Sequence, residues 1–507
     1  MFGLPSVRDK QDPANKMLAM VAAILAPVLV LLVVFVQQFM LNLNSLTLDE
    51  APRSVLESEM IDDPGIDHYT LEMKATLKEK YFLETLDEPP PPPRRGGRGK
   101  PAPQAEPDEQ VIIDEVPILE FIDEISVTRT ERLRGAIVAG DVAGKDAAIE
   151  RLTSLQKDAE PGGALAGHTH WLLRLYKEGP GVLTDEARQS LVDHHGWFGE
   201  LALTFGAPPT NSAREDLLGG FDRLMALFLG YYLFIGLTFL IGIALAVTAL
   251  IMLNNGDLTG EFDAPAFGGP VYLEAYCLFL LGFAVTVFIE IPFRTSSAST
   301  VSAGIALSQV LTWGLFGAAF WPLARGVRWD ELRIDLGLHT GAGVGREMWI
   351  GCLAFAAERP VLWLVNVIYE FLHYIFSATQ TASEPTGTDK FPLYEAPLSN
   401  AWWLLWLGAL GSVIWAPFFE ELIYRGCLYR ALHARLRWPA TVLITAFAFA
   451  IIHPYGLDGM LQVFVGGLTF GLLREWRGSL IACITCHMLH NGTIEFMSIA
   501  STRILDS

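Results

Sequence analysis

Long apolar runs dominate the pattern of hydrophobic and polar positions along the chain. A helix of about 20 predominantly apolar residues is needed to cross the hydrocarbon core of a bilayer. The short seventh and eighth runs meet at Pro454 and Gly456, which break a helix. We therefore predict an all-α fold, a polytopic transmembrane helical bundle of about eight to nine spans. The runs occupy residues 17–40, 222–253, 271–291, 301–324, 347–377, 401–424, 440–454, 457–473 and 479–500.

The segment between the first two runs has a different pattern. Residues 42–110 are polar and charged, and they include a tract rich in proline and glycine that favours an extended, loose linker. Residues 111–220 contain apolar positions at helix spacing, such as Leu133 and Ile137. This spacing predicts a helical extramembrane domain inserted after the first span.

These patterns divide the chain into five parts. The first run is an anchor rather than a signal peptide, because it is longer than the usual apolar region of about 7–15 residues and no small-residue cleavage site follows. In order, the parts are an N-terminal segment with this anchor, a polar segment with the linker, a helical extracytoplasmic domain, additional transmembrane helices and an intramembrane core, at residues 1–41, 42–110, 111–220, 221–324 and 325–507.

Composition and charge fit a membrane protein joined to an acidic soluble part. The chain is 51% hydrophobic and yet carries a formal net charge of -20. Arginine and lysine cluster before the first run and after the fourth, sixth and eighth runs. If every run crosses once, these clusters share one side, which the positive-inside rule makes cytoplasmic. The N-terminus is then cytoplasmic, and residues 42–220 are extracytoplasmic.

Two adjacent glutamates lie at the inner end of the sixth run. A charged side chain at membrane depth costs about 2.5–3.5 kcal/mol and normally faces a bundle interior or a wet cavity. Glu421 and Arg425 are four residues apart and share one helix face, whereas Glu420 lies about 100° around the helix. We interpret Glu421 as a paired, structural carboxylate and Glu420 as the one available for chemistry. Alternatively, both are solvated at a cytoplasmic helix end.

Two later runs also carry polar residues. His453 ends the seventh run, and His487 and Asn491 are stacked on one face of the last run. A single histidine in an apolar stretch is usually a core residue with satisfied hydrogen bonds. Three successive segments with such residues instead favour a site. Peptide hydrolysis needs an activated water, an oxyanion donor and a proton for the leaving amine, and these side chains can supply them.

These residues resemble the motifs of the CPBP family of intramembrane proteases, which includes the CAAX prenyl endopeptidases and bacterial Abi proteins. The resemblance covers about residues 325–500 and leaves residues 1–220 unmatched. It implies an intramembrane endopeptidase in a bacterial inner membrane, acting on a membrane-associated protein or peptide. The motifs EExxxR, FxxxH and HxxxN occur in the family's order at Glu420, Glu421 and Arg425, at Phe449 and His453, and at His487 and Asn491.

The resemblance also implies roles for the side chains. Glu420 and His453 are expected to activate water, and His487 and Asn491 to form the oxyanion hole. Tyr424, four residues after Glu420, is expected to line the same cavity. His490 is a weaker candidate, because it lies one residue from Asn491 and points elsewhere.

A metal is the main mechanistic alternative. Glu420, His453 and His487 could form a zinc site of two histidines and a glutamate, as in metallopeptidases. However, the HExxH pattern is absent, and Asn491 suits an amide donor better than a metal ligand. We favour metal-free, glutamate-dependent hydrolysis, with a divalent metal such as zinc as the alternative.

The remaining cysteines and histidines give no specific sign of a metal site. All five cysteines fall in or beside predicted spans, which argues against a disulfide framework, and the pair Cys483 and Cys486 lies inside an apolar helix. The outer histidines lack acid or thiol companions at ligand spacing, so we expect surface histidines there. They are His168, His170, His194 and His195.

Two other classes of function compete with the enzyme. In one, the chain is a catalytically silent membrane scaffold, and the outer domain binds a protein partner. In the other, the polar residues form a transporter's proton relay. A scaffold would not need to bury a set of four polar residues, which here are Glu420, His453, His487 and Asn491. A transporter is disfavoured because the hydropathy shows no inverted repeats of the kind found in transporters. We expect the lipid bilayer and a membrane-associated substrate as partners, and no nucleic acid.

Overall fold

We analysed a computed structural model of the chain, which confirms the predicted all-α fold. The described residues form helices and contain no strand. The predicted linker lies outside them. They are residues 13–49, 68–87, 115–126, 128–158, 164–208, 211–260, 262–263, 265, 268–294, 307–308, 310–377 and 402–506.

The chain forms two compact units. The membrane unit comprises the described residues within 1–48, 231–377 and 402–498. The outer unit comprises the described residues within 49–230 and residues 499–506. Each unit has its own hydrophobic core.

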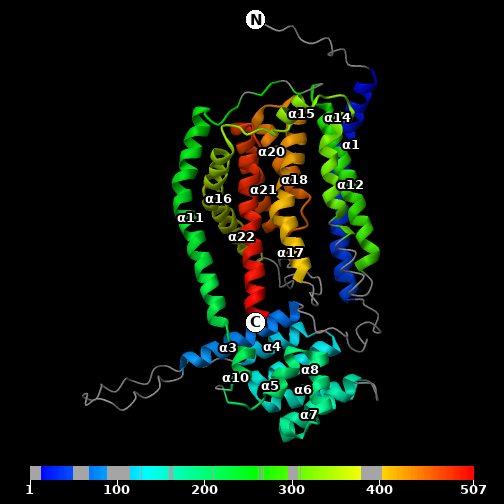
Figure 1. The fold of residues 1–507 in the computed structure, drawn as a ribbon, viewed down its shortest axis with the longest axis vertical. Coiled ribbons are helices and arrows are strands. Elements are labelled where there is room, and N and C mark those ends of the chain that lie inside the picture. Colours follow the sequence, from blue (N-terminus) through cyan, green and yellow to red (C-terminus); the bar gives the residue numbers. More distant parts are fainter. Residues whose placement is uncertain are drawn as a thin grey trace, which may run out of the picture. The chain divides into compact units, whose positions relative to one another are not determined.

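Long apolar helices make up the membrane unit (Figure 1). Its helices are α1 (Pro13–Asp49), α11 (Phe221–Asn255), α12 (Pro270–Arg294), α14 (Trp321–Ala324), α15 (Trp329–Asp335), α16 (Val344–Ser377), α17 (Trp402–Leu410), α18 (Ala416–Glu421), α19 (Tyr429–His433), α20 (Trp438–Ile451), α21 (Leu457–Arg477) and α22 (Ile481–Asp506). Many large side chains on α11 and α16 are exposed, as expected for helix faces that contact lipid.

Five helical stretches among the described residues are long and apolar enough to cross a membrane, and two apolar helices are shorter. Together they overlap the first seven predicted runs, and the start of the fourth run, residues 301–306, lies outside the described residues. The last two runs form α21 and α22, which are long but carry polar residues along their length. The five stretches are Met17–Gln37, Ser212–Asn255, Pro270–Ile289, Val344–Ile375 and Trp406–His433, and the shorter helices are Val310–Ala324 and Trp438–Ile451.

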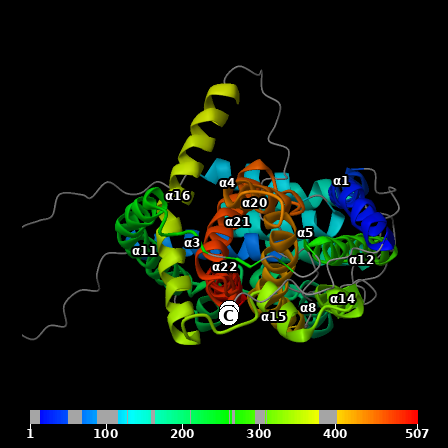
Figure 2. The ribbon, with the colours of Figure 1, turned by 90° about the horizontal axis from the view of Figure 1, so that it is seen from above.

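Small residues bring α20 and α21 together. The two helices pack along their length, and α21 also packs against α16 (Figures 1 and 2). A Cβ atom on Gly467 would lie 3.0 Å from the Cα atom of Ala446, and one on Gly471 would lie 2.9 Å from Val442 Cγ1. Glycines four residues apart therefore allow the close backbone approach that membrane helices commonly use.

The helix that carries the two glutamates is not a regular α-helix. It runs without a break from α17 to α19, but it contains two π-helical segments, Gly411–Trp415 and Leu422–Leu428. These wider turns flank α18. Such segments are rare, and they occur frequently at functional sites.

The outer unit is a small helical bundle, as predicted. Tyr69, Met73 and Leu77 of α3 belong to its core together with Ile137 of α5 and Leu172 of α7. The helix before the predicted linker is therefore packed into the bundle. The helices are α3 (His68–Asp87), α4 (Glu115–Ile125), α5 (Arg129–Ala143), α6 (Lys145–Asp158), α7 (Ala164–Glu178), α8 (Asp185–His195), α9 (Trp197–Leu203) and α10 (Ser212–Leu218).

Candidate active site

Glu421 and Arg425 form the ion pair that their spacing predicts. Arg425 Nη1 lies 3.0 Å from Glu421 Oε1, and both side chains are fully buried. Arg425 Nη2 also donates to the carbonyl oxygen of Gly467 at 3.0 Å, which ties the π-helical segment to α21. By contrast, the Glu420 side chain is 24% exposed. The two neighbouring carboxylates therefore lie in different surroundings.

His487 of α22 contacts both glutamates. Its Nδ1 atom lies 3.0 Å from Glu421 Oε1, and its Nε2 atom lies 3.7 Å from Glu420 Oε2. The ring stacks on Phe470 with centroids 4.8 Å apart, which fixes its plane. Residues 66 positions apart in the chain are thus brought into one polar group.

His453 is held in one tautomer by its backbone. Its Nδ1 atom lies 2.7 Å from the carbonyl oxygen of Phe449, and because a carbonyl can only accept, Nδ1 carries the proton. In the neutral ring, Nε2 then presents a lone pair. The Phe449 ring lies near both histidines, with centroids 4.8 Å from His453 and 5.8 Å from His487. Tyr455 stacks on the His453 ring at 5.6 Å.

Asn491 satisfies a carbonyl that the irregular helix leaves free. Its Nδ2 atom donates to the oxygen of Ser412 at 2.7 Å. In this π-helical segment the N–H of Ala416 bonds to the oxygen of Gly411, five residues earlier. In the same register Ser412 would need the N–H of Pro417, which proline lacks. One of the two amide N–H groups of Asn491 therefore has a structural partner.

Tyr424 lies in an aromatic cluster. Its ring contacts Phe449 at 5.2 Å and Tyr276 at 5.6 Å between centroids. The side chain is fully buried. Tyr424 thus packs α12 and α20 against the helix that carries the glutamates.

Comparison with known proteins tests the family resemblance that the motifs suggest. Residues 401–493 match the family model described as type II CAAX prenyl endopeptidase Rce1-like. This segment is similar to Rce1-like endopeptidases. All three motifs lie within the match, so the predicted resemblance to CAAX-type intramembrane proteases is confirmed for this segment, and a peptidase in general is supported. No curated protein and no solved structure was found to match the chain.

Just after the segment that matches the family model, sequence reasoning missed a further carboxylate. Glu495 of α22 accepts a hydrogen bond from Ser412 Oγ, with its Oε1 atom at 2.6 Å. It lies four residues after Asn491, on the same helix face. That spacing was a usable signal, because a third ionisable residue in one apolar run is uncommon.

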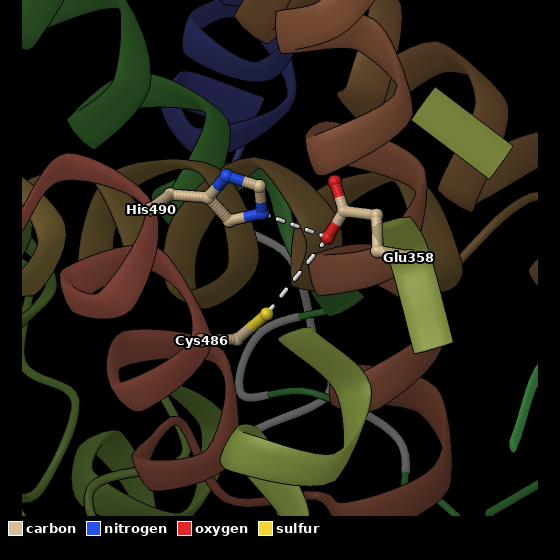
Figure 3. A group of neighbouring side chains, drawn as sticks. All are labelled: Glu358, Cys486 and His490. Carbon is tan, nitrogen blue, oxygen red and sulfur yellow. Dashed lines mark hydrogen bonds and ion pairs between the residues drawn. The ribbon is translucent and has the colours of Figure 1, made fainter. Parts of the chain in front are cut away.

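Potential metal ligands also gather beside this site. Among the described residues, one group of three has its ligand atoms within 4.8 Å of one another, and it consists of Glu358, Cys486 and His490 (Figure 3). Among the described residues, no such group is formed by the set proposed from the sequence, which is Glu420, His453 and His487. His490 points away from Asn491, as expected, and toward α16.

In the outer unit, the prediction of surface histidines is wrong for His168 and His195. Their side chains are buried, and His168 Nδ1 lies 3.0 Å from His195 Nε2. Burial lowers the pKa of His168 to about 4 and that of His195 to about 3, and the nearby charge of Arg134 lowers the latter further. His170 is exposed, as predicted. Helix periodicity alone could not show that α7 and α8 face each other there.

Proposed function

We propose that this protein is an intramembrane endopeptidase that hydrolyses peptide bonds of membrane-associated substrates with a water activated by glutamate and histidine. The observation that carries the proposal is the position of His487 between Glu420 and Glu421, at 3.7 and 3.0 Å. A purely structural bundle gains little from holding two carboxylates and an imidazole in one buried group. The Rce1-like match covers this group.

In the proposed mechanism, Glu420 is the general base. Its side chain is partly exposed, and among the described residues its ion-pair contact is with His487, whereas Glu421 is paired with Arg425. A water beside Glu420 can pass its proton to the carboxylate as it attacks the substrate carbonyl. His453 assists by accepting a hydrogen bond from this water through Nε2, since Nδ1 carries the proton.

The same group can stabilise the oxyanion and the leaving amine. The Glu421 carboxylate accepts the hydrogen bond from His487 Nδ1, so a second proton on Nε2 gives an imidazolium that lies beside this carboxylate. That Nε2–H and the second N–H of Asn491 are the proposed donors to the oxyanion. The proton taken up by Glu420 then goes to the leaving amine. No metal is required for these steps.

Purified protein in liposomes, incubated with a library of apolar peptides, tests this proposal. We expect new peptide termini with the wild-type protein and a loss of at least about 100-fold in their rate with Glu420→Gln, as for removal of a general base. Glu370→Gln is the matched control, because Glu370 is exposed on α16. Equal rates for wild type and Glu420→Gln would favour the scaffold alternative.

A further inference from the structure

Three side chains that the proposed mechanism does not use converge between α16 and α22. His490 Nε2 lies 2.9 Å from Glu358 Oε2, and Cys486 Sγ lies 3.9 Å from the same oxygen. Figure 3 shows the three groups pointing toward one another. Glu358 and Cys486 are buried, and His490 is half-buried.

Two of the three ligand separations are close to those around a tetrahedral ion, and all three ligand atoms lie within 4.8 Å of one another. With bonds of about 2.0–2.3 Å to oxygen, nitrogen and sulfur, a tetrahedral ion holds nitrogen and oxygen about 3.3 Å apart and sulfur and oxygen about 3.5 Å apart. The observed 2.9 and 3.9 Å each differ from these by about 0.4 Å. Small side-chain rotations are enough to close that difference. A thiolate, an imidazole and a carboxylate are also the ligand types that zinc prefers.

One atom of the group has an unmet need. The Glu358 side chain is fully buried, and its Oε1 atom has no hydrogen-bond partner among the described residues. A buried carboxylate oxygen without a partner is costly. Bidentate contact with a cation would satisfy it.

Arg359 does not occupy the direction from which His490 Nε2 would bind an ion. Its Nη2 atom lies 2.8 Å from Nδ1 and 2.9 Å from Nε2 of the His490 ring. The two nitrogen lone pairs diverge in the ring plane, so an atom equally close to both lies over the ring face. The in-plane direction from Nε2 therefore points to Glu358.

We propose that Glu358, Cys486 and His490 form a metal site for a zinc-like divalent ion, separate from the Glu420 group. Binding releases the thiol proton of Cys486 and places the His490 proton on Nδ1, so that thiolate, imidazole and carboxylate ligate the ion. The thiolate and the carboxylate carry two negative charges against the two positive charges of the ion, and the Arg359 guanidinium beside His490 adds one positive charge. The ion ties α16 to α22, the helix that carries His487 and Asn491.

Titration of the detergent-solubilised full chain with cobalt(II) tests the site. We expect a thiolate-to-cobalt charge-transfer band that zinc abolishes. Cys486→Ser is expected to lose the band, and Glu358→Gln to weaken binding by more than about tenfold. Cys483→Ser is the matched control, since Cys483 Sγ lies 3.3 Å from the carbonyl oxygen of Phe470 instead. Glu420→Gln should bind cobalt like the wild type, whatever its effect on hydrolysis.

The absence of a band from wild-type protein that elutes as a single species in size-exclusion chromatography would overturn the proposal. Equal bands in wild type and folded Cys486→Ser would mean an adventitious ion only and would overturn it too. If Cys486→Ser does not fold, the comparison of cobalt binding by the wild type and Glu358→Gln still tests the site, because both proteins keep the thiol. Loss of the band in Glu420→Gln alone would place the metal in the other group.

Discussion

At the scale of single residues, the imidazole of His487 joins two carboxylates with different partners. Glu421 is fully buried and is bound by both His487 and Arg425. Glu420 is more open, and its Oε2 atom lies 3.7 Å from Nε2, on the other side of the ring. In the proposed mechanism, this asymmetry separates a carboxylate that holds the group together from one that acts on the water.

Replacement of the two glutamates should therefore change the free energy of unfolding by different amounts. Glu421→Gln leaves the fully buried Arg425 without its counter-charge, and we expect a loss of about 3–5 kcal/mol in the free energy of unfolding. Glu420→Gln should change stability by less than about 1 kcal/mol, because the side chain is partly exposed. Thermal unfolding in detergent measures both. An unchanged Tm for Glu421→Gln would contradict the structural role of the pair.

At the scale of elements, the helix from α17 to α19 departs from regular geometry where the site is built. Pro417 and the π-helical turn leave the Ser412 oxygen for Asn491 of α22. The side chain that the sequence assigns to the oxyanion thus also anchors one helix to another. The 3.6-residue period used to interpret the sequence does not reveal such a turn.

The two roles of Asn491 can be separated by a second substitution. Asn491→Ala should lower the free energy of unfolding by about 1–3 kcal/mol, because the Ser412 oxygen loses its donor. It should also lower peptidase activity. Adding Pro417→Ala restores an N–H in the register of that oxygen, so stability should return while activity stays low. Recovery of activity together with stability would show that Asn491 has only the structural role.

The contact between α7 and α8 makes the outer unit sensitive to acid. Histidine in an unfolded chain has a pKa of about 6.5, whereas those of His168 and His195 are about 4 and about 3 in the fold. The unfolded state therefore binds more protons between these values, so stability is full above pH 6.5 and falls as the pH is lowered toward 4. The slope is at most about 1.4 kcal/mol per pH unit for each histidine.

Hydrogen–deuterium exchange of peptides from α7 and α8 in the full chain, corrected for the intrinsic rate at each pH, measures this loss. His195→Gln should flatten the pH dependence. His170→Gln, at an exposed position, should leave it as in the wild type. Protection that is constant from pH 7 to pH 4 would contradict the prediction.

At the scale of the whole molecule, the orientation of the chain stays a prediction. Several of the arginines on which the predicted orientation depends are structural in this fold. Arg425 and Arg474 are fully buried, and Arg430 pairs with Asp335. The positive-inside rule concerns charges in loops near the membrane surface. The orientation therefore depends on the remaining arginines and on the lysine and arginine residues before α1.

Labelling with a membrane-impermeant maleimide in intact cells tests that orientation. Ser154→Cys lies at an exposed position of the outer unit, which has no native cysteine, and should be labelled from outside. Arg435→Cys, exposed after α19, should be labelled only after the cells are opened. The wild-type chain gives the background from its native cysteines. The reverse pattern would invert the topology.

Much of the molecule could be predicted from its sequence because the signals are local. Apolar runs specify helices, and a four-residue spacing specifies the pair of Glu421 and Arg425. What could not be predicted depends on tertiary packing. Cys486 meets Glu358 across 128 residues, and His168 meets His195 between two helices of the outer unit. No periodicity in either segment records which faces meet.

Quantitative mass spectrometry of membrane-derived peptide termini, from cells that carry either the wild-type chain or Glu420→Gln at equal protein levels, tests the central claim most directly. Proteolysis by a water activated at Glu420 predicts a set of new termini in membrane-associated proteins that is present with the wild type and with Glu370→Gln. The same set should be missing with Glu420→Gln. Identical termini in all three samples would contradict the claim.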